Sequence, residues 1–122
     1  MSRNVLRAAA LLVLGGAAAL AAAQEGDQPR YERGARLFAK YCVLCHGEKG
    51  HGDGQAALLY QPRPANLTVS PYPDSYREKI IRGGGTAVGR SASMPPWGRE
   101  LSDADIAAVL VYLRRIGTEA KR

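Results

Sequence analysis

The sequence predicts one small all-helical domain, with a helix near each end and a long, loop-rich middle. Apolar residues recur with helical spacing in two stretches, around residues 34–41 and 106–116. Glycines and prolines are frequent between these stretches and interrupt regular elements. No stretch alternates apolar and polar residues as a half-buried strand does. A chain of 122 residues fits a single domain.

The first 23 residues are typical of a secretory signal peptide. Arg3 and Arg7 precede an apolar run that ends in small residues at Ala23. We therefore expect cleavage after Ala23, a mature domain of residues 24–122, and export to the periplasm or the outer face of the cytoplasmic membrane. The alternative is an uncleaved anchor, although the run is shorter than the roughly 20 residues of a membrane-spanning helix.

The charge of the chain bears on its partners. The formal net charge is +6, and the basic residues are scattered along the sequence. This favours acidic protein partners or an anionic membrane surface over nucleic acid. A domain of this size builds a marginal core, so a disulfide, a metal or a cofactor is expected to stabilise it.

The first expected helix begins near Pro29, because proline is tolerated in a first turn and Asp27 or Gln28 can cap it. It leads directly into Cys42. Its inward face has the i, i+3, i+4, i+7 spacing of a helix stripe: Gly34, Leu37, Phe38 and Tyr41.

The segment Cys42–His46 reads Cys-x-x-Cys-His, the attachment pattern of a c-type haem. Its two sulfurs can bond the two vinyl groups of one porphyrin, and the histidine that follows can bind the iron. Three alternatives compete. A zinc site needs further ligands, and the other histidine is His51. A thioredoxin-like redox pair needs a βαβ context, and a plain disulfide leaves His46 without a role.

The middle of the chain carries weaker signals. Residues 47–73 are irregular, with one helical turn expected at 56–60. A short helix is expected over residues 75–82, with Ser75 and Glu78 as its capping box and glycines at its end. Tyr76, Ile80 and Ile81 would face inward. Residues 86–100 are again irregular.

The last helix has the clearest pattern. Ser102 is its expected N-cap, with Asp103 and Asp105 in the first turn, where the helix dipole favours negative charge. Its apolar stripe comprises Ile106, Val109, Leu110, Leu113 and Ile116.

A second axial ligand of a haem iron would decide between electron transfer and ligand chemistry. The candidates are Met94, His51 or none. Met94 stands before two prolines, which stiffen its loop, and lies far enough along the chain to reach the other face of a ring from His46. His51 is too close to His46 in sequence and is expected to be a solvated loop residue.

The chain resembles class I monohaem c-type cytochromes over about residues 31–116, and most closely the haem domains of the cbb3 oxidase subunit III type. The resemblance rests on these segments: Gly34-x-x-x-Phe38, Cys42–His46, Gly52-Asp53-Gly54, Pro64-Ala65-Asn66-Leu67, Ile80-Ile81-Arg82-Gly83-Gly84, Met94-Pro95-Pro96-Trp97 and the closing helix with Val109 and Tyr112.

The resemblance implies a cytochrome c fold, in which Gly34 and Phe38 cross Val109 and Tyr112. It also implies a backbone carbonyl on the free ring nitrogen of His46, from residues 62–67 and with Pro64 as the expected source. Candidate donors to the haem propionates are Arg63, Tyr72, Arg82 and Trp97.

The sequence thus predicts a monomeric, exported one-electron carrier rather than an enzyme. One haem c is attached through Cys42 and Cys45, with His46 and Met94 on the iron. Its partners would be redox proteins docking transiently near the haem edge, including a membrane-bound oxidase or dehydrogenase. The alternatives are a haem subunit of a larger complex and a haem protein with a displaceable sixth ligand. The expected basic docking rim is Lys40, Lys49, Arg63, Arg82, Arg90 and Arg99.

Overall fold

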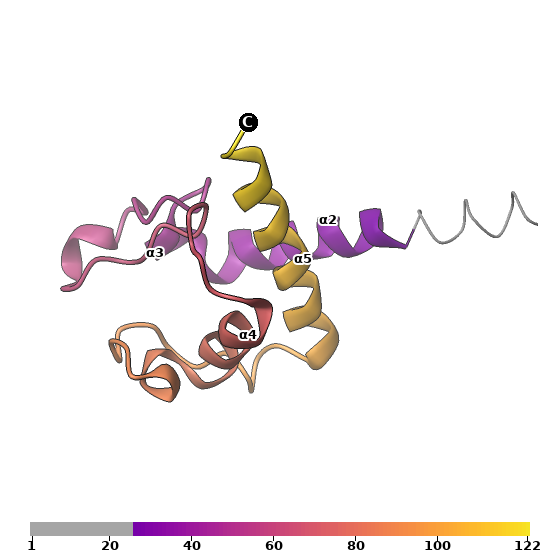
Figure 1. Cartoon of the computed structure of the whole chain (residues 1–122). Coiled ribbons are helices and arrows are strands. Elements are labelled where there is room, and N and C mark those ends of the chain that lie inside the picture. Colours follow the sequence, from indigo (N-terminus) through magenta and orange to yellow (C-terminus); the bar gives the residue numbers. More distant parts are fainter. Residues whose placement is uncertain (1–25) are drawn as a thin grey trace, which may run out of the picture.

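The computed structural model describes residues 26–122, which form α-helices and 3₁₀ turns without a strand in that range (Figure 1). The expected signal segment lies outside the described residues. In chain order the elements are α2 (Asp27–Tyr41), α3 (Val43–His46), η1 (Ala57–Leu59), α4 (Asp74–Gly83), η2 (Gly85–Val88) and α5 (Asp103–Glu119).

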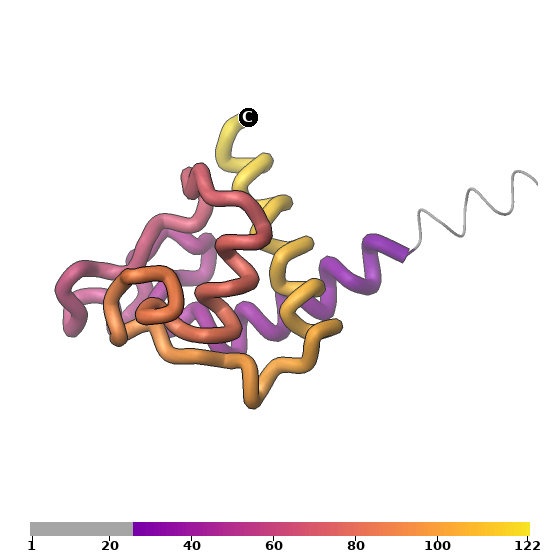
Figure 2. Tube along the Cα trace, turned by 60° about the horizontal axis from the view of Figure 1, so that its bottom comes forward, coloured from indigo at the N-terminus to yellow at the C-terminus, as the bar shows by residue number. Residues whose placement is uncertain are grey.

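The core forms where α2 and α5 cross, as the two views of the chain show (Figures 1 and 2). A Cβ on Gly34 would lie 2.1 Å from the carbonyl oxygen of Ala108, so only glycine allows this approach. The side chain of Phe38 is 1% exposed, and its ring centroid lies 5.0 Å from that of Tyr112. The predicted crossing is confirmed, with Ala108 beside Val109 in the contact.

Helix α5 forms as expected from its sequence. Ser102 and Asp105 make a reciprocal capping box, in which the Asp105 N–H donates to Ser102 Oγ at 3.1 Å. The whole predicted stripe, from Ile106 to Ile116, is buried. Ile81 of α4 and Leu101 complete the same apolar cluster.

Two helix starts differ from the sequence-based expectation. Helix α2 begins at Asp27, two residues before Pro29, and no side chain caps it. An acid in the first turn is favourable there, so the helix extends to include Asp27. Helix α4 begins at Asp74, directly after Pro73, and the predicted capping box of Ser75 and Glu78 is absent from it.

Helix α4 begins earlier than expected because of Pro73, whose backbone is extended. The irregular segment before the helix therefore ends one residue earlier than the sequence predicted. Asp74 then occupies the first turn and forms an ion pair with Arg77 at 3.5 Å. Glu78 instead pairs with Arg82 at 2.9 Å. The turn η2 overlaps the start of a stretch expected to be irregular, residues 86–100, and η1 matches the expected turn at 56–60.

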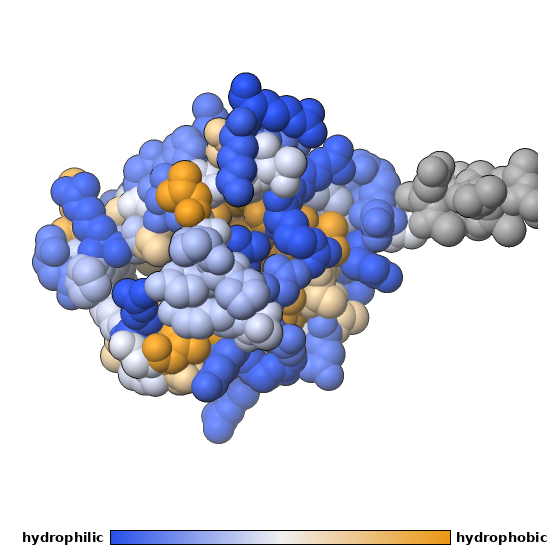
Figure 3. All heavy atoms as spheres, in the orientation of Figure 1, coloured by the Kyte–Doolittle hydropathy of each residue, from blue (hydrophilic) through white to orange (hydrophobic). Residues whose placement is uncertain are grey.

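The surface is largely hydrophilic on the face that Figure 3 shows, with apolar residues in separate patches. No helix within residues 26–122 is long and apolar enough to cross a membrane.

Candidate functional site

Cys42 stands at the junction between α2 and α3 and fixes the geometry of the Cys-x-x-Cys-His segment. Its N–H donates to the Phe38 carbonyl at 2.9 Å, which ends α2 on the core. Its own carbonyl accepts from Cys45 at 3.2 Å and from His46 at 2.8 Å. Residues 42–46 therefore form a single helical turn that holds two sulfurs and one imidazole in fixed relation.

Both cysteines are free and half-buried. Burial, and second the neighbouring Cys45, raises the pKa of Cys42 to about 12. A thiol with such a pKa stays protonated at neutral pH, unlike the activated thiolate of a redox Cys-x-x-Cys pair. No group of three or more histidine, cysteine and acidic side chains gathers as a metal cluster among residues 26–122.

The ring of His46 is oriented by a backbone carbonyl, as the resemblance implied. Its Nδ1 lies 3.0 Å from the oxygen of Ala65. A carbonyl can only accept, so Nδ1 carries the proton and Nε2 keeps its lone pair. Burial lowers the pKa of His46, and the bond to Ala65 opposes that effect in part. A neutral imidazole with one free lone pair is the form that binds a metal.

The expected acceptor, Pro64, was one residue from the observed one. The Pro64 carbonyl points instead at Gly52, where a Cβ would lie 2.3 Å from its oxygen. Gly52 has a φ of +80°, in the left-handed region that favours glycine. The next carbonyl in the chain, that of Ala65, is the one that faces His46.

The loop after His46 folds back over the Cys-x-x-Cys-His turn. The N–H of Gly52 donates to the His46 carbonyl at 2.8 Å, and that of Gly54 donates to Cys45 at 3.1 Å. The N–H of Ala56 donates to Leu44 at 2.9 Å. These bonds satisfy the carbonyls at the end of α3 that have no helical partner, so the turn is braced by its own chain.

Met94 lies on a second loop, between η2 and α5. Its carbonyl accepts from the N–H of Gly85 at 2.9 Å, and the residue is half-buried. Trp97, which follows the two prolines, packs on Tyr41 with ring centroids 5.1 Å apart. Tyr41 directly precedes Cys42, so tertiary packing brings the Met94 loop beside the Cys42–His46 turn.

The other candidate residues have different surroundings. His51 is exposed. Arg82, expected in the docking rim and as a propionate donor, forms ion pairs with Glu78 at 2.9 Å and Asp103 at 2.8 Å. These carboxylates occupy its guanidinium, so Arg82 serves to join α4 to α5. The other five basic residues of the expected rim have no ion-pair partner among residues 26–122: Lys40, Lys49, Arg63, Arg90 and Arg99.

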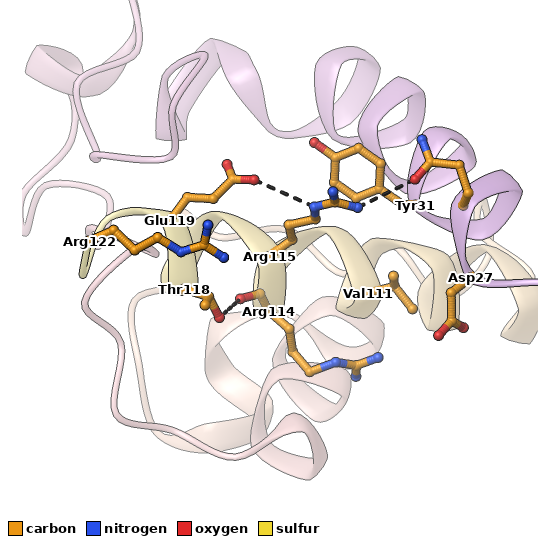
Figure 4. A pocket seen from close by; sticks show the side chains of 9 residues that line it. Asp27, Tyr31, Val111, Arg114, Arg115, Thr118, Glu119 and Arg122 are labelled. Atoms are coloured by element: carbon orange, nitrogen blue, oxygen red, sulfur yellow. Dashed lines mark hydrogen bonds and ion pairs between the residues drawn. The ribbon is translucent and has the colours of Figure 1, made fainter. Parts of the chain in front are cut away.

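A hollow of about 510 Å³ lies elsewhere, between the start of α2 and the end of α5 (Figure 4). Arg115 crosses it, with its guanidinium 4.6 Å from the Tyr31 ring and hydrogen-bonded to Gln28 at 3.4 Å. It also pairs with Glu119 at 3.5 Å. These partners already satisfy the charge of Arg115, the residue that crosses the hollow. We therefore assign the contacts of Arg115 a structural role in joining α2 to α5.

The donor set of the Cys42–His46 side suits a c-type haem. It offers two thiols on one turn, a neutral imidazole with a free lone pair, and a thioether on a braced loop. Large apolar side chains are also left exposed there: Leu58 is 70% exposed and Leu59 is 80% exposed. Leu44, whose carbonyl accepts from Ala56 directly before η1, is 62% exposed. Packing against a flat apolar cofactor would remove the apolar surface of such side chains from water.

Comparisons with known proteins agree with this chemistry. A family described as cytochrome c oxidase, cbb3-type, subunit III matches residues 29–113. The cbb3-type cytochrome c oxidase subunit FixP of Azorhizobium caulinodans is 33% identical over 105 residues, which cover 80% of this chain and 31% of that protein. The subunit CcoP of Cereibacter sphaeroides is 31% identical over 101 residues, covering 77% and 30%. CcoP of Azospirillum brasilense is 26% identical over 91 residues, covering 75% and 30%. The chain thus spans about a third of the length of these curated relatives.

Proposed function

The chain belongs to the family of cbb3-type cytochrome c oxidase subunit III, and on this premise we propose that it is an electron-transfer haem domain serving a membrane-bound oxidase. Domains of this family bind a c-type haem. The matching relatives are named as subunits of a cbb3-type cytochrome c oxidase. This favours the haem-subunit alternative over an independent carrier, which the sequence alone had placed first.

We assign the attachment and ligand roles to four residues. Cys42 and Cys45 form the thioether bonds, while His46 and Met94 bind the iron. When bound, the haem supplies a one-electron couple, and methionine as a ligand raises its potential relative to a second histidine. The protein does not itself catalyse a reaction in this proposal.

The contact between His46 Nδ1 and the Ala65 carbonyl, 3.0 Å long, is the observation that carries the proposal. It fixes the ring orientation and makes the opposite nitrogen a better donor. The loop of residues 47–67 holds that carbonyl in place through its bonds to the Cys42–His46 turn. A neutral histidine held in this way is preorganised to bind iron without rearranging.

Replacing Met94 tests the ligand assignment. We expect Met94→Ala to lose the sulfur-to-iron charge-transfer band and to bind carbon monoxide at least tenfold more tightly than the wild type, because it leaves an open axial position. Met94→His should restore weak carbon monoxide binding and lower the redox potential. Wild-type protein that already binds carbon monoxide readily would instead favour a haem protein with a displaceable ligand.

Attachment is tested separately. A pyridine haemochrome spectrum of exported wild-type protein should show two saturated vinyl positions. The double variant Cys42→Ala, Cys45→Ala should release its haem on acid extraction, since no thioether remains. Covalent haem in that variant would refute the assignment of both cysteines.

An independent exported carrier is the second candidate. The five basic residues of the expected rim that form no ion pair within residues 26–122 would suit transient docking to acidic redox proteins near the haem edge. Co-purification separates the two functions. A subunit stays with the oxidase in mild detergent, whereas a carrier elutes as a monomer and leaves the membrane at high salt.

We also propose that residues 1–23 direct export, which leaves residues 24–122 in the periplasm or on the outer face of the cytoplasmic membrane. Intact mass measurement of the exported protein tests this boundary. A mass that begins at Gln24 supports cleavage, and a mass that retains the segment identifies it as an anchor.

A further inference from the structure

The backbone of Met94 is hydrogen-bonded to Gly85. The Gly85 N–H donates to the Met94 carbonyl at 2.9 Å, and its own carbonyl accepts from the Arg90 N–H at 2.8 Å. A Cβ on Gly85 would lie 1.9 Å from the Ser91 carbonyl oxygen, so this position leaves no room for a side chain. Met94 and Arg90 are therefore hydrogen-bonded to the amide and to the carbonyl of the same residue, Gly85.

The side chain of Arg90 holds this loop to a different part of the chain. Its Nη2 donates to the Tyr72 hydroxyl, and its guanidinium carbon lies 5.7 Å from the Tyr72 ring centroid. Tyr72 stacks on Tyr76, with ring centroids 4.1 Å apart and planes 17° from parallel. The side-chain oxygens of Tyr76 and then Tyr72, which can accept from the guanidinium, raise the pKa of Arg90.

The two tyrosines are themselves fixed. Tyr76 lies on α4, and its N–H donates to the Pro73 carbonyl at 3.1 Å. Arg77 donates to the Ser70 carbonyl at 3.2 Å and so holds the segment before Tyr72 against α4. Helix α4 packs on α5 through Ile81 in the core. Arg90 thus connects the Met94 loop to the rigid helical part of the molecule.

We propose that Arg90, acting with Tyr72 and Tyr76, is a positioning residue for Met94. Its role is to hold the loop so that the thioether stays within reach of the iron. This rests on the proposed function, because it requires Met94 to be the axial ligand. Arg90 does not touch the iron in this proposal, and it acts through its hydrogen bond to Gly85.

The test compares Arg90→Leu with a matched control, Arg99→Leu, in the haem-loaded protein. Arg99 is also exposed and has no hydrogen-bond or ion-pair partner among residues 26–122. We expect Arg90→Leu to weaken the sulfur-to-iron charge-transfer band and to raise carbon monoxide affinity roughly three- to tenfold, the range set by losing one hydrogen bond. Arg99→Leu should leave both unchanged.

Two further variants separate positioning from general loss of structure. Tyr72→Phe keeps the stacked ring but removes the hydroxyl, and it should shift the band in the same direction as Arg90→Leu. Arg90→Lys retains a donor and should recover part of the wild-type signal. Amide hydrogen exchange should quicken at Gly85 in Arg90→Leu but not at Trp97, whose N–H donates to Ile81 at 2.8 Å, a hydrogen bond separate from those of Gly85.

The Met94→Ala variant, measured in parallel, separates the two ways in which the proposal can fail. If Met94→Ala loses the band and Arg90→Leu keeps the wild-type band and carbon monoxide affinity, the role of Arg90 is refuted and the function stands. If Met94→Ala keeps the band, the ligand assignment is wrong, and the role of Arg90 falls with it. Equal quickening of exchange at Gly85 and Trp97 would likewise refute a specific role.

Discussion

The crossing of α2 and α5 and the loop side of the molecule are held together in different ways. At the crossing, side chains determine the geometry: Phe38, Ile106 and Val109 are each about 1% exposed. On the loop side, backbone hydrogen bonds and glycines determine it. Between Gly47 and Leu67, five loop N–H groups donate to carbonyls of residues 44–50, at 2.7 to 3.1 Å.

The two regions also differ in their ion pairs. Ion pairs join the helices to one another, as in Arg33 with Asp105 at 2.7 Å and Arg82 with Asp103 at 2.8 Å. Arg114 also pairs with Asp74 and joins α5 to α4. The loop side instead leaves large apolar side chains exposed, including Leu58, Leu59 and Val69. The crossing can therefore form from protein alone, whereas the loop side has a backbone scaffold but little core of its own.

The largest effect is expected at the crossing. Gly34→Ala places a Cβ 2.1 Å from the Ala108 carbonyl oxygen, which would force the helices apart. We expect a loss of about 3 kcal/mol or more in the free energy of unfolding, measured by urea denaturation. Gly117→Ala is the control, because its Cβ would lie 3.5 Å from Thr68 and meet ordinary contact. It should stabilise α5 by about 0.5 kcal/mol. A small loss at Gly34 would show that the crossing adapts easily.

An intermediate effect is expected on the loop side. Gly52→Ala combines a φ of +80° with a Cβ 2.3 Å from the Pro64 oxygen, and we expect a loss of about 2 kcal/mol. It should also alter the haem spectrum, because the Ala65 carbonyl moves from His46. Gly89→Ala has a φ of +69° and meets no atom within 4 Å, so it should cost only about 1 kcal/mol without a spectral change. If the two variants lost the same stability and had the same haem spectrum, the role of the Pro64 contact would be contradicted.

The smallest effect is expected at the cap of α5. Ser102→Ala should cost about 1 kcal/mol at neutral pH, as read from thermal unfolding. Ser75→Ala is the control, since the predicted capping box there does not form. The Ser75→Ala variant should have the same stability in thermal unfolding as the wild type. A comparable loss at Ser75 would mean that α4 is capped after all.

The cap also gives a dependence on pH. Hydrogen bonds from Ser102 and then the Arg33 guanidinium lower the pKa of Asp105 from its ordinary value of 3.8. The unfolded chain therefore binds this proton more readily, so the stabilisation is present above about pH 4 and is lost as the pH falls through the lower folded value. The difference in stability between Ser102→Ala and the wild type should accordingly become smaller as the pH falls below about 4. A constant difference would exclude Asp105 as its source.

The sequence by itself determined the features that depend on neighbouring residues. The Cys42–His46 turn, the cap at Ser102 and the apolar stripe of α5 are all local patterns, because a helix repeats every few residues and one turn contains its own signal. The glycine at position 34 was also interpretable, through the resemblance, as a helix contact. These features cover the two end helices and the proposed attachment site.

Only the tertiary structure decided the contacts between distant segments. It selected Ala65 rather than Pro64 as the partner of His46, and it placed the Pro64 carbonyl against Gly52 instead. It bonded the backbone of Met94 to Gly85 and joined Arg90 to Tyr72, 18 residues away in the chain. Which carbonyl or side chain is met in such contacts depends on how the whole chain closes on itself, and no local spacing specifies that.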